Sequence, residues 1–387
     1  MSRLRPSRST VVYVAYLAAV GIAFGYLLLV GQRTFSAYAF LKSDHLGFRG
    51  QVHRADSELG FAAVPGAQGF HVFPVGPPFA MRYDADGFRI PASQAPDILR
   101  RRPLVLALGC SFTYGDGCRA EEVYPYLVAE ELGGTALNAG KCAYGLSQML
   151  LLARRLIPQH QPDYVLVQFS TWLPGRGTSG FARATFGRVP VPFLLLHEDG
   201  TAGVHPPVFG TRVFDLPFDE FDNKRRGAGE FARFFFSAGA PLFVYDDLSM
   251  AAYALRRGLG RLPEVDQERA QKSREQLNRV VYAEIGRLAA DSGATMVIVR
   301  LSHPLEQHWQ RLKELSPGAL VVNAQAALDA RVPSGKRDDY YRLFGHWRGT
   351  PPRLLDNHPN PAAHRLIADE VVRAIRSAAT GTPTARR

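Results

Sequence analysis

Three continuous apolar runs, separated by stretches of helical periodicity, restrict the fold of this chain more than any other feature of its sequence. The runs are LVLALG from Leu104, YVLVQF from Tyr164 and ATMVIVRL from Ala294. Runs of this kind are typical of strands that are buried on both faces of a parallel sheet. Amphipathic stretches over 147–157 and 267–290 precede the second and third runs. Strands that alternate with helices predict βαβ units.

The remaining C-terminal region extends this pattern. A shorter strand, ALVVNA, is predicted from Ala319, and a last helix begins near Pro361, since proline suits the first turn of a helix. We therefore predict a three-layer, doubly wound α/β fold with a parallel sheet over 101–380. Residues 43–100 read as a β-rich connecting segment, and residues 174–265 as a long insertion of poor periodicity.

An apolar run over 11–31 contains no charged residue, and about 20 apolar residues let a helix cross a bilayer. We predict a single-pass transmembrane helix in the inner (cytoplasmic) membrane, preceded by a tail of residues 1–10. Three arginines stand in that tail, Arg3, Arg5 and Arg8. The positive-inside bias therefore places the N-terminus in the cytoplasm and the main domain in the periplasm or outside the cell.

A cleaved signal peptide is the alternative reading of the N-terminus. Ala37-Tyr38-Ala39 offers the small-x-small pattern of a cleavage site. The apolar run is longer than the roughly 7 to 15 residues of a signal peptide's hydrophobic region, and the pattern lies well past the end of the run. An uncleaved anchor fits the sequence better.

The charge and the cysteines restrict the partners. The formal net charge is +11, but the Lys and Arg residues are scattered and no nucleic-acid-binding module accompanies them, so we predict no nucleic-acid partner. The three cysteines, Cys110, Cys118 and Cys142, allow one internal pair, and a Cys118–Cys142 disulfide is our hypothesis. No spacing typical of a zinc site or phosphate-binding loop occurs, so no metal or cofactor is predicted.

A serine follows the first core strand on a strand-to-helix turn, in the stretch GCSFTYGDG that contains Ser111. Such a turn presents the hydroxyl at the carboxyl edge of the sheet, where open α/β folds bind their ligands. Backbone N–H groups there can also face a developing oxyanion. The pattern alone is weak, because a serine after a strand is more often a helix N-cap.

A histidine and an aspartate stand far downstream in Asp356-Asn357-His358, just before the last predicted helix. An imidazole can remove the serine proton, and a carboxylate on its other ring nitrogen fixes the tautomer. Ser111, His358 and Asp356 are therefore the candidate catalytic residues. Because the Asp-x-His spacing is short, a dyad oriented by a backbone carbonyl stays an alternative. Cys110 is a weaker candidate nucleophile, since a thiol at a strand end more often packs in the core.

Together these blocks resemble the SGNH (GDSL-like) hydrolase and acyltransferase family, in the bacterial membrane-anchored form, over roughly residues 80–380. The stretch DADGFRIP before the first strand is similar to members that carry an N-terminal membrane helix. Asn138-Ala139-Gly140 looks like the family's second block. The resemblance implies a flavodoxin-like three-layer fold, with the backbone N–H groups of Gly140 and Ser111 as oxyanion donors.

The chain departs from the family pattern at three places. Trp172 stands where the third block carries an asparagine that donates to the oxyanion, and its indole N–H makes it a further candidate donor. Cys110 replaces the aspartate of the first block, and the last block is Asp-x-His instead of Asp-x-x-His. Loss of one oxyanion donor can slow a reaction by about 10²- to 10³-fold, so a catalytically weak protein is the alternative.

The resemblance and the predicted compartment imply an extracytoplasmic ester hydrolase, O-acyltransferase or deacetylase. The expected substrate is an acylated glycan of an envelope or exported polysaccharide, and lipid esters are the rival substrates. A membrane-bound acyl-donor partner is a further expectation for an anchored enzyme of this kind. The alternative function is a weak or inactive SGNH-like module that binds glycan or assists assembly.

Overall fold

The computed structural model describes most of the chain in two units. The described residues are 7–42, 47–50, 52–72, 77–97, 99–184, 187–197, 199–207, 267–302 and 316–381, with the single residues 229, 252 and 255. The first unit comprises Met1–Ser43 and Asn223–Glu264, and the second comprises Asp44–Asp222 and Val265–Arg387.

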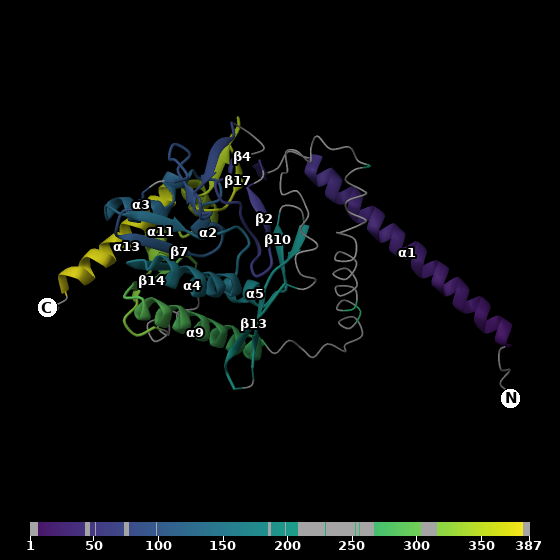
Figure 1. Ribbon diagram of the computed structural model, residues 1–387. Coiled ribbons are helices and arrows are strands. Elements are labelled where there is room, and N and C mark those ends of the chain that lie inside the picture. Colours follow the sequence, from purple (N-terminus) through teal and green to yellow (C-terminus); the bar gives the residue numbers. More distant parts are fainter. Residues whose placement is uncertain are drawn as a thin grey trace. The chain divides into compact units, whose positions relative to one another are not determined.

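A five-stranded parallel sheet forms the centre of the second unit (Figure 1). In spatial order its strands are β8 (Thr135–Asn138), β7 (Leu104–Leu108), β9 (Tyr164–Phe169), β14 (Thr295–Arg300) and β15 (Leu320–Val322). The three apolar runs form β7, β9 and β14, and their side chains are buried almost throughout. Numbered along the chain, the order is 2-1-3-4-5, as in flavodoxin-like doubly wound folds. The predicted fold class is confirmed.

Helices cover both faces of the sheet and complete the three layers. On one face, α3 (Tyr124–Glu131), α11 (Ala324–Asp329) and α13 (Pro361–Gly381) pack together over a continuous apolar core. On the other face, α4 (Leu146–His160) packs against α9 (Gln267–Asp291) (Figure 1). These helices form because their apolar residues recur every three or four positions, which gives each helix one side to bury.

Short antiparallel strands precede β7 in the chain. Four of them form one sheet, β1 (Gly47–Arg49), β4 (Gln68–Val72), β5 (Phe79–Tyr83) and β6 (Arg89–Ile90), and two form a hairpin, β2 (His53–Asp56) and β3 (Gly60–Ala63). The hydroxyls of Tyr83 and Tyr114 lie 2.7 Å apart, and Arg89 donates to the Tyr114 carbonyl at 2.9 Å. This segment therefore supports the turn that follows β7.

Part of the predicted insertion is described. It contains α5 (Leu173–Gly177) and two hairpins, β10 (Phe181–Ala184) with β11 (Gly187–Pro190), and β12 (Phe193–Leu196) with β13 (Ala202–His205). Apart from three single positions, residues 208–266 lie outside the described residues. The interpretation of that stretch as an insertion stays a prediction.

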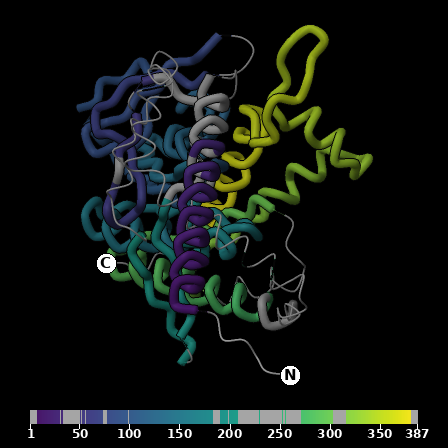
Figure 2. Tube along the Cα trace, turned by 90° about the vertical axis from the view of Figure 1, so that its right-hand side faces the viewer, coloured from purple at the N-terminus to yellow at the C-terminus, as the bar shows by residue number. Residues whose placement is uncertain are grey.

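A projecting element lies close to the end of the chain. Helix α12 (Arg337–Phe344) leads into a hairpin of β16 (His346–Arg348) and β17 (Arg353–Asp356). The helix and the hairpin stand out from the rest of the second unit (Figure 2). Because β17 ends at Asp356 and α13 begins at Pro361, the hairpin positions the loop that carries His358.

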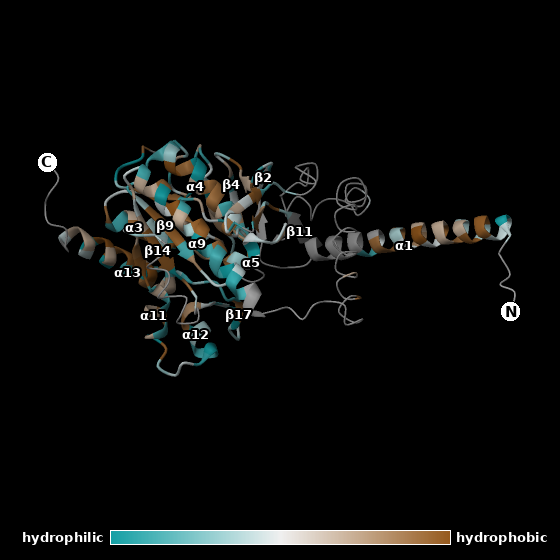
Figure 3. Ribbon diagram, turned by 90° about the horizontal axis from the view of Figure 1, so that it is seen from below, coloured by the Kyte–Doolittle hydropathy of each residue, from teal (hydrophilic) through white to brown (hydrophobic). Residues whose placement is uncertain are grey.

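The first unit contributes one described helix, α1 (Arg8–Lys42). Its segment Arg8–Leu29 has a mean hydropathy of 2.1 and is long enough to cross a membrane, although a signal sequence meets the same criteria. Hydrophobic residues dominate this segment (Figure 3). The helix extends beyond the predicted span of 11–31 at both ends.

Candidate active site

Ser111 lies where open α/β sheets bind their ligands. It begins the short helix α2 (Ser111–Tyr114) directly after β7, and the strand order reverses between β7 and β9. Gly109 permits this turn, because a Cβ at that position would lie 2.6 Å from Gln168 Oε1 and still closer to Thr113 Oγ1. Only glycine fits between the two side chains.

Gln168 holds the serine turn in place from the end of β9. Its Oε1 accepts the Cys110 backbone N–H at 3.0 Å and the Thr113 hydroxyl at 2.8 Å. Its Nε2 donates to Ser170 Oγ at 2.9 Å and to Cys110 Sγ at 3.2 Å. The sequence analysis missed this residue, although a glutamine inside an otherwise apolar strand was a signal that it has buried partners.

The structure brings Ser111, His358 and Asp356 into one hydrogen-bonded chain. His358 Nε2 lies 2.8 Å from Ser111 Oγ, and His358 Nδ1 lies 2.5 Å from Asp356 Oδ1. Asp356 Oδ1 also accepts the backbone N–H of His358 at 2.9 Å. This turn, in which an aspartate accepts a backbone N–H two residues on, explains how the short Asp-x-His spacing reaches the ring. The backbone-carbonyl alternative is unnecessary in this geometry.

The electrostatics favour a protonated imidazole. Burial lowers the pKa of His358, but the hydrogen bond to Asp356 and the nearby Asp116 carboxylate outweigh burial and raise that pKa to about 9. Burial raises the pKa of Asp356, yet the hydrogen bonds from His358 prevail and lower it. The two shifts agree, because each group stabilises the charge of the other.

The candidate oxyanion donors differ in their availability. The Gly140 N–H donates to Asn138 Oδ1 at 3.0 Å, so in this structure it is already engaged. No described residue accepts the backbone N–H of Ser111. Trp172 Nε1 is buried and has no acceptor among the described residues. Its ring packs edge-on against Phe112 with the centroids 5.0 Å apart.

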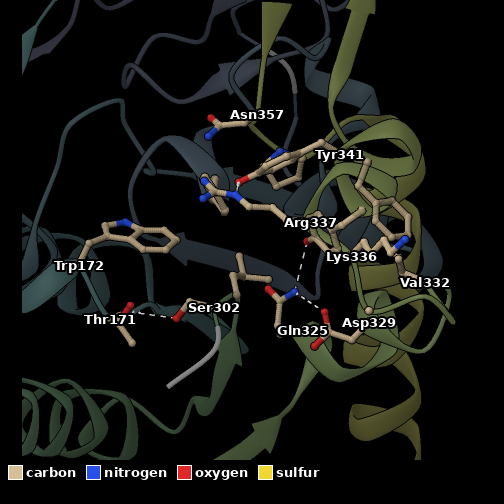
Figure 4. A pocket seen from close by; sticks show the side chains of 16 residues that line it. Thr171, Trp172, Ser302, Gln325, Asp329, Val332, Lys336, Arg337, Tyr341 and Asn357 are labelled. Carbon is tan, nitrogen blue, oxygen red and sulfur yellow. Dashed lines mark hydrogen bonds between the residues drawn. The ribbon is translucent and has the colours of Figure 1, made fainter. Parts of the chain in front are cut away.

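Figure 4 shows a cavity of about 740 Å³, which none of the three catalytic candidates lines. Phe112, Asn357 and Pro359, which adjoin Ser111 and His358 in the sequence, form part of its wall. The other lining residues are Thr171, Trp172, Leu301, Ser302, Gln325, Asp329, Val332, Gly335, Lys336, Arg337, Tyr340, Tyr341 and Phe344. Trp172 faces the α12 side chains across the cavity (Figure 4). Aromatic rings therefore alternate with amide, carboxylate and cationic groups, and sequence reasoning identified only Trp172 among them.

The predicted Cys118–Cys142 disulfide is wrong, because all three cysteines are free thiols. Cys118 Sγ lies 3.4 Å from the Pro359 carbonyl, and Cys142 Sγ lies 2.9 Å from Asp116 Oδ1. The two loops lie on the same side of the sheet, but each thiol has a different partner. Cys110 accepts a hydrogen bond from Gln168 beneath the serine turn. His358 contacts the Ser111 hydroxyl, so Ser111 is the better candidate nucleophile.

Comparison with known proteins yields structural likeness alone. No family model matches the sequence, and no curated protein matches it. A G-D-S-L family protein from Desulfitobacterium hafniense DCB-2 has 12% identity and a TM-score of 0.32, covering 70% of this chain and 99% of its own. The esterase EstA from Pseudoalteromonas sp. has 11% identity and a TM-score of 0.34, covering 72% and 100%.

A third solved structure belongs to an acetylxylan esterase. Axe2 from Geobacillus stearothermophilus, in a catalytic mutant form, has 14% identity and a TM-score of 0.33, covering 75% of this chain and 99% of its own. Likeness at this level adds no weight to a functional argument.

Proposed function

We propose that this protein is an SGNH-type serine ester hydrolase or O-acyltransferase with Ser111 as its nucleophile. The observation that carries the proposal is the unbroken chain from Ser111 Oγ through His358 to Asp356, with separations of 2.8 and 2.5 Å. A serine hydroxyl becomes a competent nucleophile when an oriented imidazole removes its proton. The position of Ser111 at the carboxyl edge of the sheet supports the same conclusion.

The reaction follows from this geometry. Ser111 Oγ attacks the ester carbonyl carbon while its proton passes to His358 Nε2, and Asp356 stabilises the imidazolium. The intermediate then collapses, the ester C–O bond breaks, and His358 returns the proton to the leaving oxygen. Water or a sugar hydroxyl attacks the acyl-Ser111 carbonyl in the second half, with His358 again as the base.

The oxyanion is stabilised by two donors in this proposal. The backbone N–H of Ser111 and the indole N–H of Trp172 are both without an acceptor among the described residues. Such donors stabilise the charge that develops on the carbonyl oxygen. Gly140 joins them only if its N–H leaves Asn138.

An O-acylated polysaccharide is the proposed substrate. The cavity in Figure 4 combines aromatic rings with hydrogen-bonding groups. Sugar rings offer apolar faces to the aromatic rings and hydroxyls to the hydrogen-bonding groups, whereas a long acyl chain could pack only against the aromatic rings. Lipid esters therefore remain the second choice within this reaction class.

The proposed location is outside the cytoplasm, with α1 as the anchor. The apolar segment Arg8–Leu29 supports the anchor, and the arginines before it support a cytoplasmic N-terminus. A periplasmic or extracellular domain could then receive acyl groups from a membrane-bound partner. A C-terminal alkaline phosphatase fusion tests the orientation, because that reporter folds into its active form only outside the cytoplasm of a bacterial host.

A weak or inactive glycan-binding or assembly module is the second candidate. Two observations favour it, namely the engaged Gly140 N–H and a tryptophan in place of the expected asparagine. In this reading the same cavity binds an acylated glycan without turning it over. Tight glycan binding that is unaffected by Ser111→Ala would favour the module.

Covalent labelling separates the two candidates. The full chain in detergent is treated with a fluorophosphonate, and intact mass is measured for the wild type, Ser111→Ala, His358→Ala and a control, Ser334→Ala, at an exposed serine. We expect one adduct on the wild type and the control and none on the other two variants. A folded wild type without an adduct would overturn the enzyme proposal.

A further inference from the structure

A second carboxylate faces the imidazole from the side opposite Asp356. Asp116 Oδ2 lies 3.9 Å from His358 Nε2, the nitrogen that also contacts Ser111. The Asp116 side chain is only 12% exposed, so its charge is little screened by water. His358 therefore lies between two acids, of which the Asp-x-His motif contains only Asp356.

The backbone around Asp116 holds the carboxylate in this position. Gly115 and Gly117 flank it with φ values of 80° and 81°, a conformation that favours glycine. A Cβ at Gly117 would lie 2.7 Å from the ring of His346. The Asp116 backbone N–H donates to the Ser111 carbonyl at 3.1 Å, which ties the acid to the turn that carries the nucleophile.

A cysteine thiol orients the carboxylate. Cys142 Sγ donates to Asp116 Oδ1 at 2.9 Å, which leaves Oδ2 toward His358. Cys142 comes from the loop after β8, so three separate chain segments converge here.

We infer that Asp116 is a positioning residue that sets the basicity of His358 through the charge that it places beside Nε2. This inference rests on the proposed function. When Ser111 gives its proton to Nε2, the imidazolium that forms is stabilised by Asp356 at one nitrogen and by Asp116 at the other. Asp116 itself makes no contact with the ester in this role.

The other groups around the two residues do not cancel this effect. Those that act on His358, besides the two acids, are Cys110, His346 on β16, His71 on β4 and His364 on α13. Burial raises the pKa of Asp116, and the groups that act on it, besides His358 and Asp356, are Cys142 and Arg89 on β6. Arg89 donates to the carbonyls of Tyr114, Gly115 and Cys118 instead of pairing with the acid. Burial lowers the pKa values of His71, His346 and His364, which keeps these neighbours neutral.

A more basic imidazole has two opposed consequences. At high pH it is a stronger general base, because proton transfer from Ser111 becomes more favourable. At low pH a larger share of the resting enzyme carries an imidazolium, which has no lone pair for the serine proton. Removing the Asp116 charge should therefore raise the reaction rate at low pH and lower it at high pH.

The test measures the rate of fluorophosphonate labelling against pH in the full chain. For Asp116→Asn we expect the rise in rate with pH to move down by about 1 to 3 pH units, the shift that an adjacent opposite charge produces. The plot of labelling rate against pH for Asp116→Asn should cross the plot for the wild type. Asp369→Asn, which removes an exposed acid on α13, serves as the charge-matched control and should leave the profile in place. An unmoved profile for Asp116→Asn would overturn the inference.

Two further measurements keep the inference testable on its own. A wild type that is never labelled would defeat the proposed function, but NMR titration of His358 in Ser111→Ala, with and without Asp116→Asn, would still measure the pKa difference. If Asp116→Asn does not fold, Asp116→Ser removes the same charge and should move the titration in the same direction. Asp116→Glu keeps a carboxylate and should stay near the wild-type value, and equal His358 titrations in Asp116→Ser and Asp116→Glu would refute the inference.

Discussion

Replacing Asp356 with asparagine tests the core of the site with little change of shape. Asp356 Oδ1 accepts two hydrogen bonds from His358, at 2.5 Å from Nδ1 and 2.9 Å from the backbone nitrogen. Its side chain is 8% exposed, so water cannot replace those bonds. An asparagine amide can donate to Nδ1, which would move the ring proton to Nε2. The ring could then no longer accept the proton of Ser111.

The expected loss is large. A wrong tautomer of this kind lowers kcat by about 10⁴-fold in a serine triad, which corresponds to about 5.5 kcal/mol of transition-state stabilisation at 1.36 kcal/mol for each factor of ten. The wild-type rate used in this comparison depends on pH. With a His358 pKa of about 9, only about 1% of the imidazole is neutral at pH 7, and activity should rise with pH up to that value.

The assay is hydrolysis of p-nitrophenyl acetate by the full chain near pH 10, with fluorophosphonate labelling in parallel. Asp338→Asn, at an exposed acid on α12, is the control and should keep the wild-type rate. The melting temperature of each variant separates misfolding from loss of chemistry. A folded Asp356→Asn protein that hydrolyses the ester at the wild-type rate would refute the catalytic role of Asp356.

Three other changes give separate tests. Gly109→Ala should abolish fluorophosphonate labelling and lower the free energy of unfolding in urea by about 1 to 3 kcal/mol, because the new methyl group overlaps the Thr113 side chain. The control Gly175→Ala, which has open space around it, should change neither the labelling nor the stability. Trp172→Phe should reduce esterase activity by about 10²- to 10³-fold if the indole donates to the oxyanion, and unchanged activity would exclude that role. Burial lowers the pKa of His364 to about 3 in the folded protein. Between pH 6.5 and pH 3 this histidine is therefore protonated in the unfolded chain but neutral in the folded protein. Urea titrations should show wild-type stability dropping across that window by up to about 1.4 kcal/mol per pH unit, and His364→Gln should flatten the slope.

Much of the fold could be predicted because a strand that is buried on both faces requires apolar residues at consecutive positions of the sequence. Strands buried on both faces had to be continuously apolar, and β7, β9 and β14 were recognised from that property. The disulfide was predicted wrongly for a related reason. Two loops on one side of a sheet can bring cysteines near each other, but the direction of each thiol depends on partners that the spacing does not reveal.

The partners of Ser111 illustrate the same limit. The motif around it and the Asp-x-His pair suggested which residues belong together, and in the structure Ser111 contacts His358 across 247 positions of the chain. Gln168 and Asp116 were not identified, since neither belongs to a spacing that signals chemistry. The hydrogen bond from the Gly140 N–H to Asn138 could not be predicted from the sequence either.

The sequence by itself determined the alternation of strands and helices, the apolar N-terminal helix and the residue types available for acyl transfer. Each of these depends on side-chain chemistry and on neighbours close in the chain. Only the tertiary structure decided that two acids flank His358, that Trp172 and α12 face each other across a cavity, and that all three thiols stay free. These features depend on the distances and directions between groups far apart in the chain, and the packing of the layers sets them.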